Sequence, residues 1–95
     1  MIPIEPGRVV LSKAGRDTGR RFVVLAADDT YAAIADGDLR KAEKPKKKKL
    51  RHVRATQGFF PSIAGILEGG GLPTNAEIRG CLSEQSAERR EAEGL

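Results

Sequence analysis

The sequence has no tryptophan, one tyrosine and three phenylalanines among its 95 residues. A chain of this length buries only a small core, which must therefore be built from Val, Ile, Leu and Ala. The single cysteine, Cys81, excludes an intramolecular disulfide. With His52 as the one histidine, the chain also lacks the Cys/His cluster that a zinc site requires. This sparse use of cysteine fits a reducing compartment, and we expect a cytoplasmic location.

Long apolar runs are missing too, and none approaches the roughly 20 residues of a membrane span. The first seven residues contain two prolines rather than an apolar stretch behind a charged end, so we expect neither a signal peptide nor a membrane partner. The carboxylates of Asp28, Asp29, Asp36 and Asp38 fall at turns, where aspartate is favoured because its side chain caps the turn. No nucleophile is paired with a positioned base. We therefore expect no enzyme activity, no metal, no cofactor and no small-molecule substrate.

What the sequence does contain is an uneven charge. The formal net charge is +4, yet residues 40–54 hold nine Lys/Arg against one Glu. Residues 1–39 hold five Lys/Arg against six Asp/Glu, and residues 55–95 hold three against six. A basic segment between two acidic ones indicates a polyanionic partner more directly than the total does. Its four consecutive lysines, residues 46–49, repel one another, so we expect them to be extended and to gain from phosphate neutralisation.

Residues 7–56 predict β-structure. Apolar runs at 9–11, 22–27 and 30–35 predict three strands, and less regular patterns at 39–43 and 50–56 predict a fourth and a fifth. Polar turn residues separate them, among them the two glycines of the loop over residues 13–19. Short strands joined by tight turns favour a small closed barrel, because closure removes exposed strand edges.

The rest of the chain differs in character. Residues 57–73 are expected to be a Gly-rich linker with at most one helical turn, because residues 69–71 are all glycine. Thr74 followed by Glu77 forms a capping box, and Ile78 and Leu82 follow at helical spacing. This predicts a helix over about 75–91 within a C-terminal segment of residues 74–95. The apolar face of that helix is thin, which leaves open whether it is fully ordered without a partner.

Residues 7–25, GRVVLSKAGRDTGRRFVVL, contain a glycine, an apolar strand, a basic loop with glycines and a second apolar strand. This pattern resembles the KOW motif of ribosomal proteins and transcription elongation factors. YAAIADG at 31–37, LRK at 39–41 and KPKKKKL at 44–50 look like the eukaryotic-type large-subunit ribosomal protein fourteen and its short bacterial relatives. The resemblance covers residues 7–54 and implies a five-stranded SH3-like barrel whose loop touches RNA or protein. The long helical extension of that family is missing or replaced here by residues 58–95.

The candidate RNA-binding residues come from the basic loop and the basic segment. Gly15 and Gly19 let backbone amides approach a phosphate closely, arginine offers a planar fork, and lysine offers a point charge. No helix-turn-helix or basic zipper accompanies the charge, and the resemblance implies structured RNA, so RNA is preferred over DNA. The plain alternatives are an ordinary solvated hairpin and a disordered solubilising loop. The candidates are Lys13, Arg16, Arg20, Arg21, Arg40, Lys41, Lys44, Lys46, Lys47, Lys48, Lys49, Arg51 and Arg54.

Two hypotheses follow. In the first, the chain is a non-enzymatic, ribosomal or ribosome-associated protein that holds phosphates of structured rRNA. Its acidic helix then contacts a protein or folds back on the basic face as an RNA mimic. In the second, the chain is a protein-interaction module of the transcription or translation machinery. The helix around Ile78 and Leu82 then docks on a partner such as RNA polymerase or a ribosomal protein.

Overall fold

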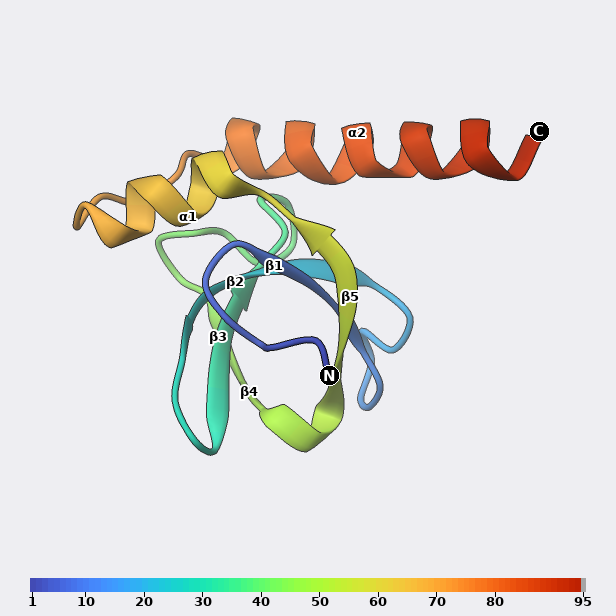
Figure 1. Ribbon diagram of the computed structural model, residues 1–95. Coiled ribbons are helices and arrows are strands. Elements are labelled where there is room, and N and C mark those ends of the chain that lie inside the picture. Colours follow the sequence, from blue (N-terminus) through green and yellow to red (C-terminus); the bar gives the residue numbers. More distant parts are fainter. Residues whose placement is uncertain (95) are drawn as a thin grey trace.

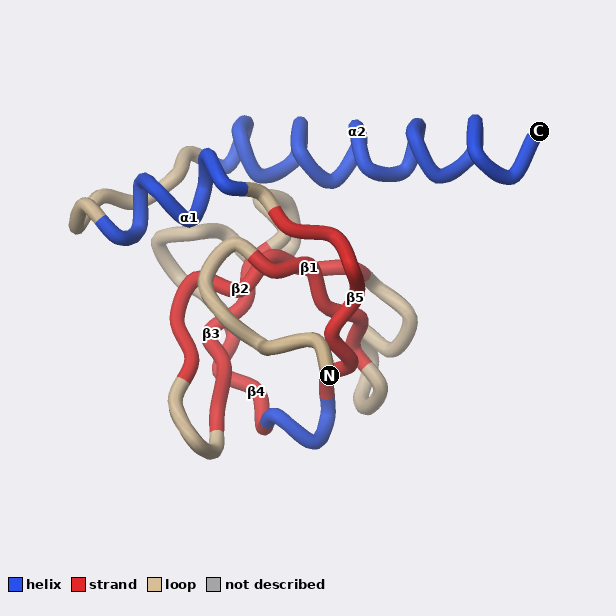
Figure 2. The backbone as a smooth tube through the Cα atoms, in the orientation of Figure 1, coloured by secondary structure: helices blue, strands red, loops and turns tan. Residues whose placement is uncertain are grey.

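The computed structural model describes the backbone of residues 1–94 and the side chains of residues 1–84. Five strands form one antiparallel sheet in the order β4-β3-β2-β1-β5. The sheet curls round on itself, and both helices lie over one side of it (Figures 1 and 2). The elements are β1 (Arg8–Ser12), β2 (Arg21–Ala27), β3 (Tyr31–Ala35), β4 (Lys46–Lys49), the 3-10 turn η1 (Leu50–His52), β5 (Val53–Phe59), α1 (Pro61–Glu68) and α2 (Asn75–Gly94).

The sheet buries apolar side chains on both of its faces. Successive residues of a strand point to opposite sides, so Phe22 and Val24 of β2 enter an inner core while Val23 and Leu25 enter an outer one. The curl of the sheet encloses the inner core, whose other buried members are Val10, Ala32, Ile34 and Val53. The helices cover the outer core, which also contains Val9, Ala35, Ala42, Ile63, Ile78 and Leu82. This double burial explains why residues 9–11 of β1 and 22–25 of β2 are continuous apolar runs rather than alternating patterns.

The second helix begins where its capping residues predict. The Thr74 amide donates to Glu77 Oε1 (3.0 Å), and the Glu77 amide donates to Thr74 Oγ1 (3.1 Å), which is the reciprocal pair of a capping box. The first turns of α2 bury Ile78 and Leu82 on the sheet, and its later turns extend past the sheet (Figure 1). No helix within residues 1–94 has the length and apolar character needed to cross a membrane.

A mainly β fold with five strands and a C-terminal helix is confirmed, but the fourth strand was placed wrongly. Residues 39–43 form a loop, and β4 is the lysine run instead. The loop forms because Asp36 Oδ1 accepts hydrogen bonds from the amides of Asp38 (2.9 Å) and Arg40 (2.8 Å), which binds this backbone locally instead of to β3.

Residues 57–73 also differ from the predicted linker. β5 continues to Phe59, and α1 follows with Pro61 at its start, where proline's missing N–H costs nothing. Ile63 of α1 is fully buried in the outer core. The segment is therefore largely part of the folded unit, and the glycine run only connects α1 to α2.

Candidate nucleic-acid interface

The pleat of β4 sorts its four lysines into two groups. Lys48 is paired with Ala32 and Lys46 with Ile34, both of which point into the inner core, so these two lysines start on the inner face. Lys47 and Lys49 therefore point outward. Lys47 places its ammonium 4.5 Å from the ring centre of Tyr31, a cation–π contact.

Lys48 is buried, with a side chain only 7% exposed. Its ammonium donates to Ser12 Oγ (2.6 Å), to the Ala14 carbonyl (2.6 Å) and to Asp17 Oδ1 (2.5 Å). An ammonium has three protons, and all three are used here. Lys48 therefore ties β4 to the loop between β1 and β2, and its ammonium has no unused donor for an RNA phosphate.

Asp17 is the counterion that the lysine run needs in order to form a strand. Lys48 contacts one of its oxygens, and Lys46 Nζ lies 3.6 Å from the other. Burial by itself raises the pKa of Asp17, but the hydrogen bonds from Lys48 and Ser12 and the charges of both lysines outweigh it and lower the pKa to about 2. The carboxylate is thus ionised throughout the physiological range, and it lies between the two inward lysines and offsets one of their two positive charges.

These contacts hold the loop over residues 13–20, here called the hairpin loop, in one shape. The Gly19 amide donates to the Ser12 carbonyl (2.8 Å), and the Ser12 amide donates to the Arg20 carbonyl (3.0 Å). The Thr18 hydroxyl donates to the Gly15 carbonyl (2.6 Å). A loop fixed this way loses little conformational freedom when it binds a ligand.

A second fixed loop, residues 36–45, faces it and is here called the 36–45 loop. Arg20 NH2 and Asp36 Oδ2 form an ion pair at 3.0 Å that joins the two loops. Burial by itself raises the pKa of Asp36, but the amides of Arg40 and Asp38 and the Arg20 guanidinium outweigh it and lower that pKa. From the other side, the Ala42 amide donates to Asn75 Oδ1 (2.8 Å) at the start of α2.

Between these two loops lies a cavity of about 420 Å³, here called the basic cleft. Four cationic side chains line it, but two of them already have a counterion: Lys46 shares the carboxylate of Asp17 with Lys48, and Arg20 is paired with Asp36. The side chains of Arg16 and Arg40 are exposed and make no hydrogen bond or ion pair within the described side chains. The lining residues are Arg16, Asp17, Arg20, Phe22, Leu39, Arg40 and Lys46.

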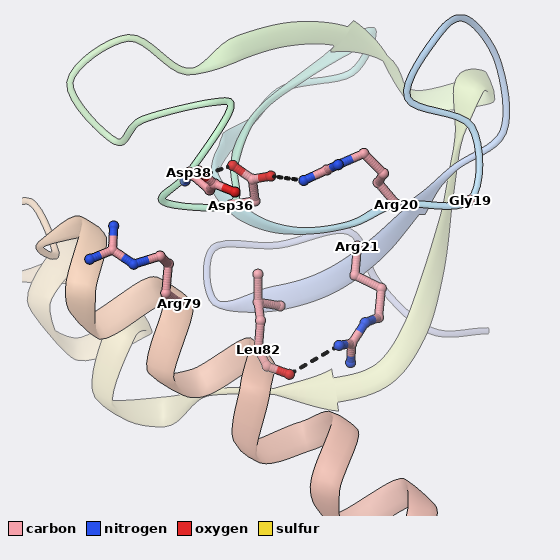
Figure 3. Close-up of a pocket in the computed structure, with 7 residues that line it drawn as sticks. All are labelled: Gly19, Arg20, Arg21, Asp36, Asp38, Arg79 and Leu82. Carbon is pink, nitrogen blue, oxygen red and sulfur yellow. Dashed lines mark hydrogen bonds and ion pairs between the residues drawn. The ribbon is translucent and has the colours of Figure 1, made fainter.

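A second cavity of about 400 Å³ lies on the other side of Arg20, against α2 (Figure 3). Its arginines are already engaged: Arg20 by Asp36, Arg21 by the Leu82 carbonyl (3.0 Å) and Arg79 by the Gly37 carbonyl (2.6 Å). Its lining also includes two carboxylates, so its charges nearly cancel. Of these two cavities, the basic cleft is the stronger candidate for an anion.

The structure brings only some of the predicted residues together. Arg16 and Arg20 of the hairpin loop meet Arg40 and Lys46 in the basic cleft. Lys41 and Lys44 are exposed on the 36–45 loop. Lys47 is paired with Ala33 at the middle of β3, and Lys49 and Arg51 lie near Tyr31 at the other end of that strand. Lys13 follows β1 and is bonded through its amide to the His52 carbonyl, and Arg54 of β5 is paired with Leu11. Arg21 faces α2.

The structure also adds one residue that sequence reasoning missed. Leu39 was expected in a strand, but it lies 66% exposed on the rim of the basic cleft. The available signal was a lone leucine between the charged residues Asp38 and Arg40, directly after the turn at Asp36 and Gly37. Conversely, Ile78 and Leu82, proposed as a docking face, are buried on the protein's own sheet.

Comparison of the chain with protein-family models and with curated protein sequences finds no match.

Proposed function

We propose that this protein is a non-enzymatic RNA-binding protein of the KOW, SH3-like type that acts in or near the ribosome in the cytoplasm. The observation that carries the proposal is the basic cleft. Two loops fixed by internal contacts hold Arg16 and Arg40 with their guanidinium groups unpaired within the described residues. Charges that face solvent without an internal counterion are available to phosphates, and binding releases the cations condensed on RNA.

RNA is favoured over other polyanions by two further points. The resemblance over residues 7–54 implies structured RNA, and it places the KOW loop in the segment that forms one wall of the cleft. The alternative, a protein-interaction module, relied on the apolar face around Ile78 and Leu82. Because those two side chains are buried against the sheet, the structure gives this alternative no specific support.

The proposal is tested by fluorescence anisotropy with labelled structured rRNA fragments and duplex DNA over a series of salt concentrations. We expect RNA binding that weakens steeply with salt, with a log–log slope of roughly −0.7 to −0.9 for each phosphate contacted. Absence of RNA binding even at low salt, or binding that salt does not change, would refute it. A variant in which all four lysines of residues 46–49 are replaced by alanine is unsuitable as a test of the site, because it also removes the buried contact of Lys48 with Asp17 that supports the fold.

A further inference from the structure

The basic cleft combines two kinds of surface. Its walls are cationic, but its floor is the buried ring of Phe22, and Leu39 stands exposed on its rim. Phosphate contact alone requires charge and gains nothing from an exposed leucine surrounded by arginines. A ligand that covers this side chain must therefore bring an apolar surface as well as a negative charge.

The shape of the cleft adds to this requirement. A volume of about 420 Å³ lies in the range of pockets that enclose small organic molecules, about 300–1,000 Å³. The outer surface of a regular duplex is convex, and its bases are stacked inside, so it would touch only the rim of such a cavity. A single nucleotide turned out of the helix supplies a phosphate for the arginines and a base with a flat apolar face.

We propose that the basic cleft binds an unpaired nucleotide of RNA, with its phosphate between Arg16, Arg40 and Lys46 and its base against Leu39. This inference rests on the proposed function and specifies its ligand. Arginine guanidinium planes stack on unpaired bases, so the walls contribute to base contact as well as to charge neutralisation. Because both loops are fixed before binding, the cleft does not have to form around its ligand.

The second cavity, shown in Figure 3, does not offer the same chemistry as the basic cleft. Its three arginines are held by a carboxylate and two backbone carbonyls, and Asp36 and Asp38 lie beside them. A phosphate there would have to displace these contacts and approach two negative charges. The unpaired nucleotide is therefore assigned to the basic cleft.

The test uses three RNA hairpins of one sequence: fully paired, with a one-nucleotide bulge, and with the same bulge carrying an abasic residue. We expect the bulged hairpin to bind about tenfold more tightly than the paired one, and the abasic hairpin to lose most of that gain, because the base is the group that covers Leu39 and stacks on an arginine plane. Leu39→Ala removes the apolar surface that the base covers, so it should reduce the preference for the bulge about fivefold and leave binding of the paired hairpin unchanged.

Leu72→Ala is the matched control, because Leu72 is also exposed (50%) but does not line the cleft. Equal affinity for all three hairpins would overturn this inference and leave RNA binding intact. An abasic bulge that binds as well as the complete one would also overturn it, because only the phosphate would then be recognised. Failure of every hairpin to bind would instead refute the proposed function.

Discussion

Replacing Lys48 by methionine should destabilise this protein far more than the same change at any exposed lysine. The ammonium of Lys48 is buried and makes three hydrogen bonds, one of them to the carboxylate of Asp17. Methionine fills similar space, so the change removes the charge and the donors while preserving the packing. The carboxylate of Asp17, whose side chain is only 12% exposed, is then left without its main partner.

The size of the effect follows from that geometry. Removing one partner of a buried ion pair costs roughly 3–5 kcal/mol. Asp17 retains the hydrogen bond from Ser12 and the ion pair with Lys46, so we expect a loss of about 2–3 kcal/mol in the free energy of unfolding. That is a large part of the roughly 5–14 kcal/mol expected for a domain of this length. The corresponding decrease in Tm is about 10–20 °C.

Urea unfolding followed by far-ultraviolet circular dichroism measures this loss, since the chain has no tryptophan. Lys49→Met is the control: it makes the same chemical change on the same strand at an exposed position, and it should shift stability by less than about 0.5 kcal/mol. Adding Asp17→Asn to Lys48→Met should cost less than the sum of the single losses, because the unpaired charge is then removed too. Equal stability of the Lys48→Met and Lys49→Met proteins would refute the reasoning.

Three further predictions concern the elements around the site. Gly37 has φ +78°, and an added Cβ would lie 2.4 Å from the Asn75 carbonyl oxygen, so Gly37→Ala should cost more than about 2 kcal/mol in urea unfolding. Gly19→Ala, at φ +87° with open space around it, should cost only about 1 kcal/mol; equal losses would mean that the clash is relieved. Since the folded pKa of Asp17 is lowered from 3.8 to about 2, its contribution is complete above pH 3.8 and is lost as pH falls through 2. Allowing for solvent screening, we expect about 1–2 kcal/mol of acid-dependent stability that Asp17→Asn lacks, and an unchanged pH profile in that variant would contradict the assignment. Thr74→Ala should lower the free energy of unfolding by about 1 kcal/mol and reduce the helical circular-dichroism signal, whereas Thr74→Ser, which keeps the hydroxyl, should do neither. Equal behaviour of the two variants would show that the hydroxyl of residue 74 does not cap α2.

The elements that sequence predicted well are those whose signals are local. The first three strands were placed within a residue or two, because apolar runs bounded by turn residues define β1, β2 and β3. The start of α2 was also found, since its capping box lies within four residues of chain. In each case the residues that determine the element are neighbours in sequence.

The fourth strand could not be found that way. Four adjacent lysines predict mutual repulsion, and the group that relieves it, Asp17, comes about thirty residues earlier in a loop. α1 did carry a local signal, with proline at its start and Ile63, Ile66 and Leu67 at helical spacing. The glycine run after it led that segment to be interpreted as a linker.

The candidate site could be predicted only in part, because its residues are also brought together by contacts between segments distant in sequence. Charge counting identifies basic residues, but only the pleat of β4 and the curl of the sheet decide which side each faces. Thus Lys48 became a structural residue, Lys47 and Lys49 separated from Lys46, and Leu39 joined the cleft. No local pattern in the sequence indicates that two loops about twenty residues apart form opposite walls of one cavity.

The central claim, that the basic cleft is the RNA-binding site, is tested most directly by comparing two variants of equal charge. One carries Arg16→Gln and Arg40→Gln in the cleft, and the other carries Lys49→Gln and Arg51→Gln at the far end of β3. All four side chains are exposed, so neither variant should lose stability. The account predicts that the cleft variant binds a structured rRNA fragment at least tenfold more weakly, with a log–log salt slope smaller by roughly 1.5, while the other variant stays within about threefold of wild type. Equal weakening of both would show that affinity follows total charge, and would contradict the claim.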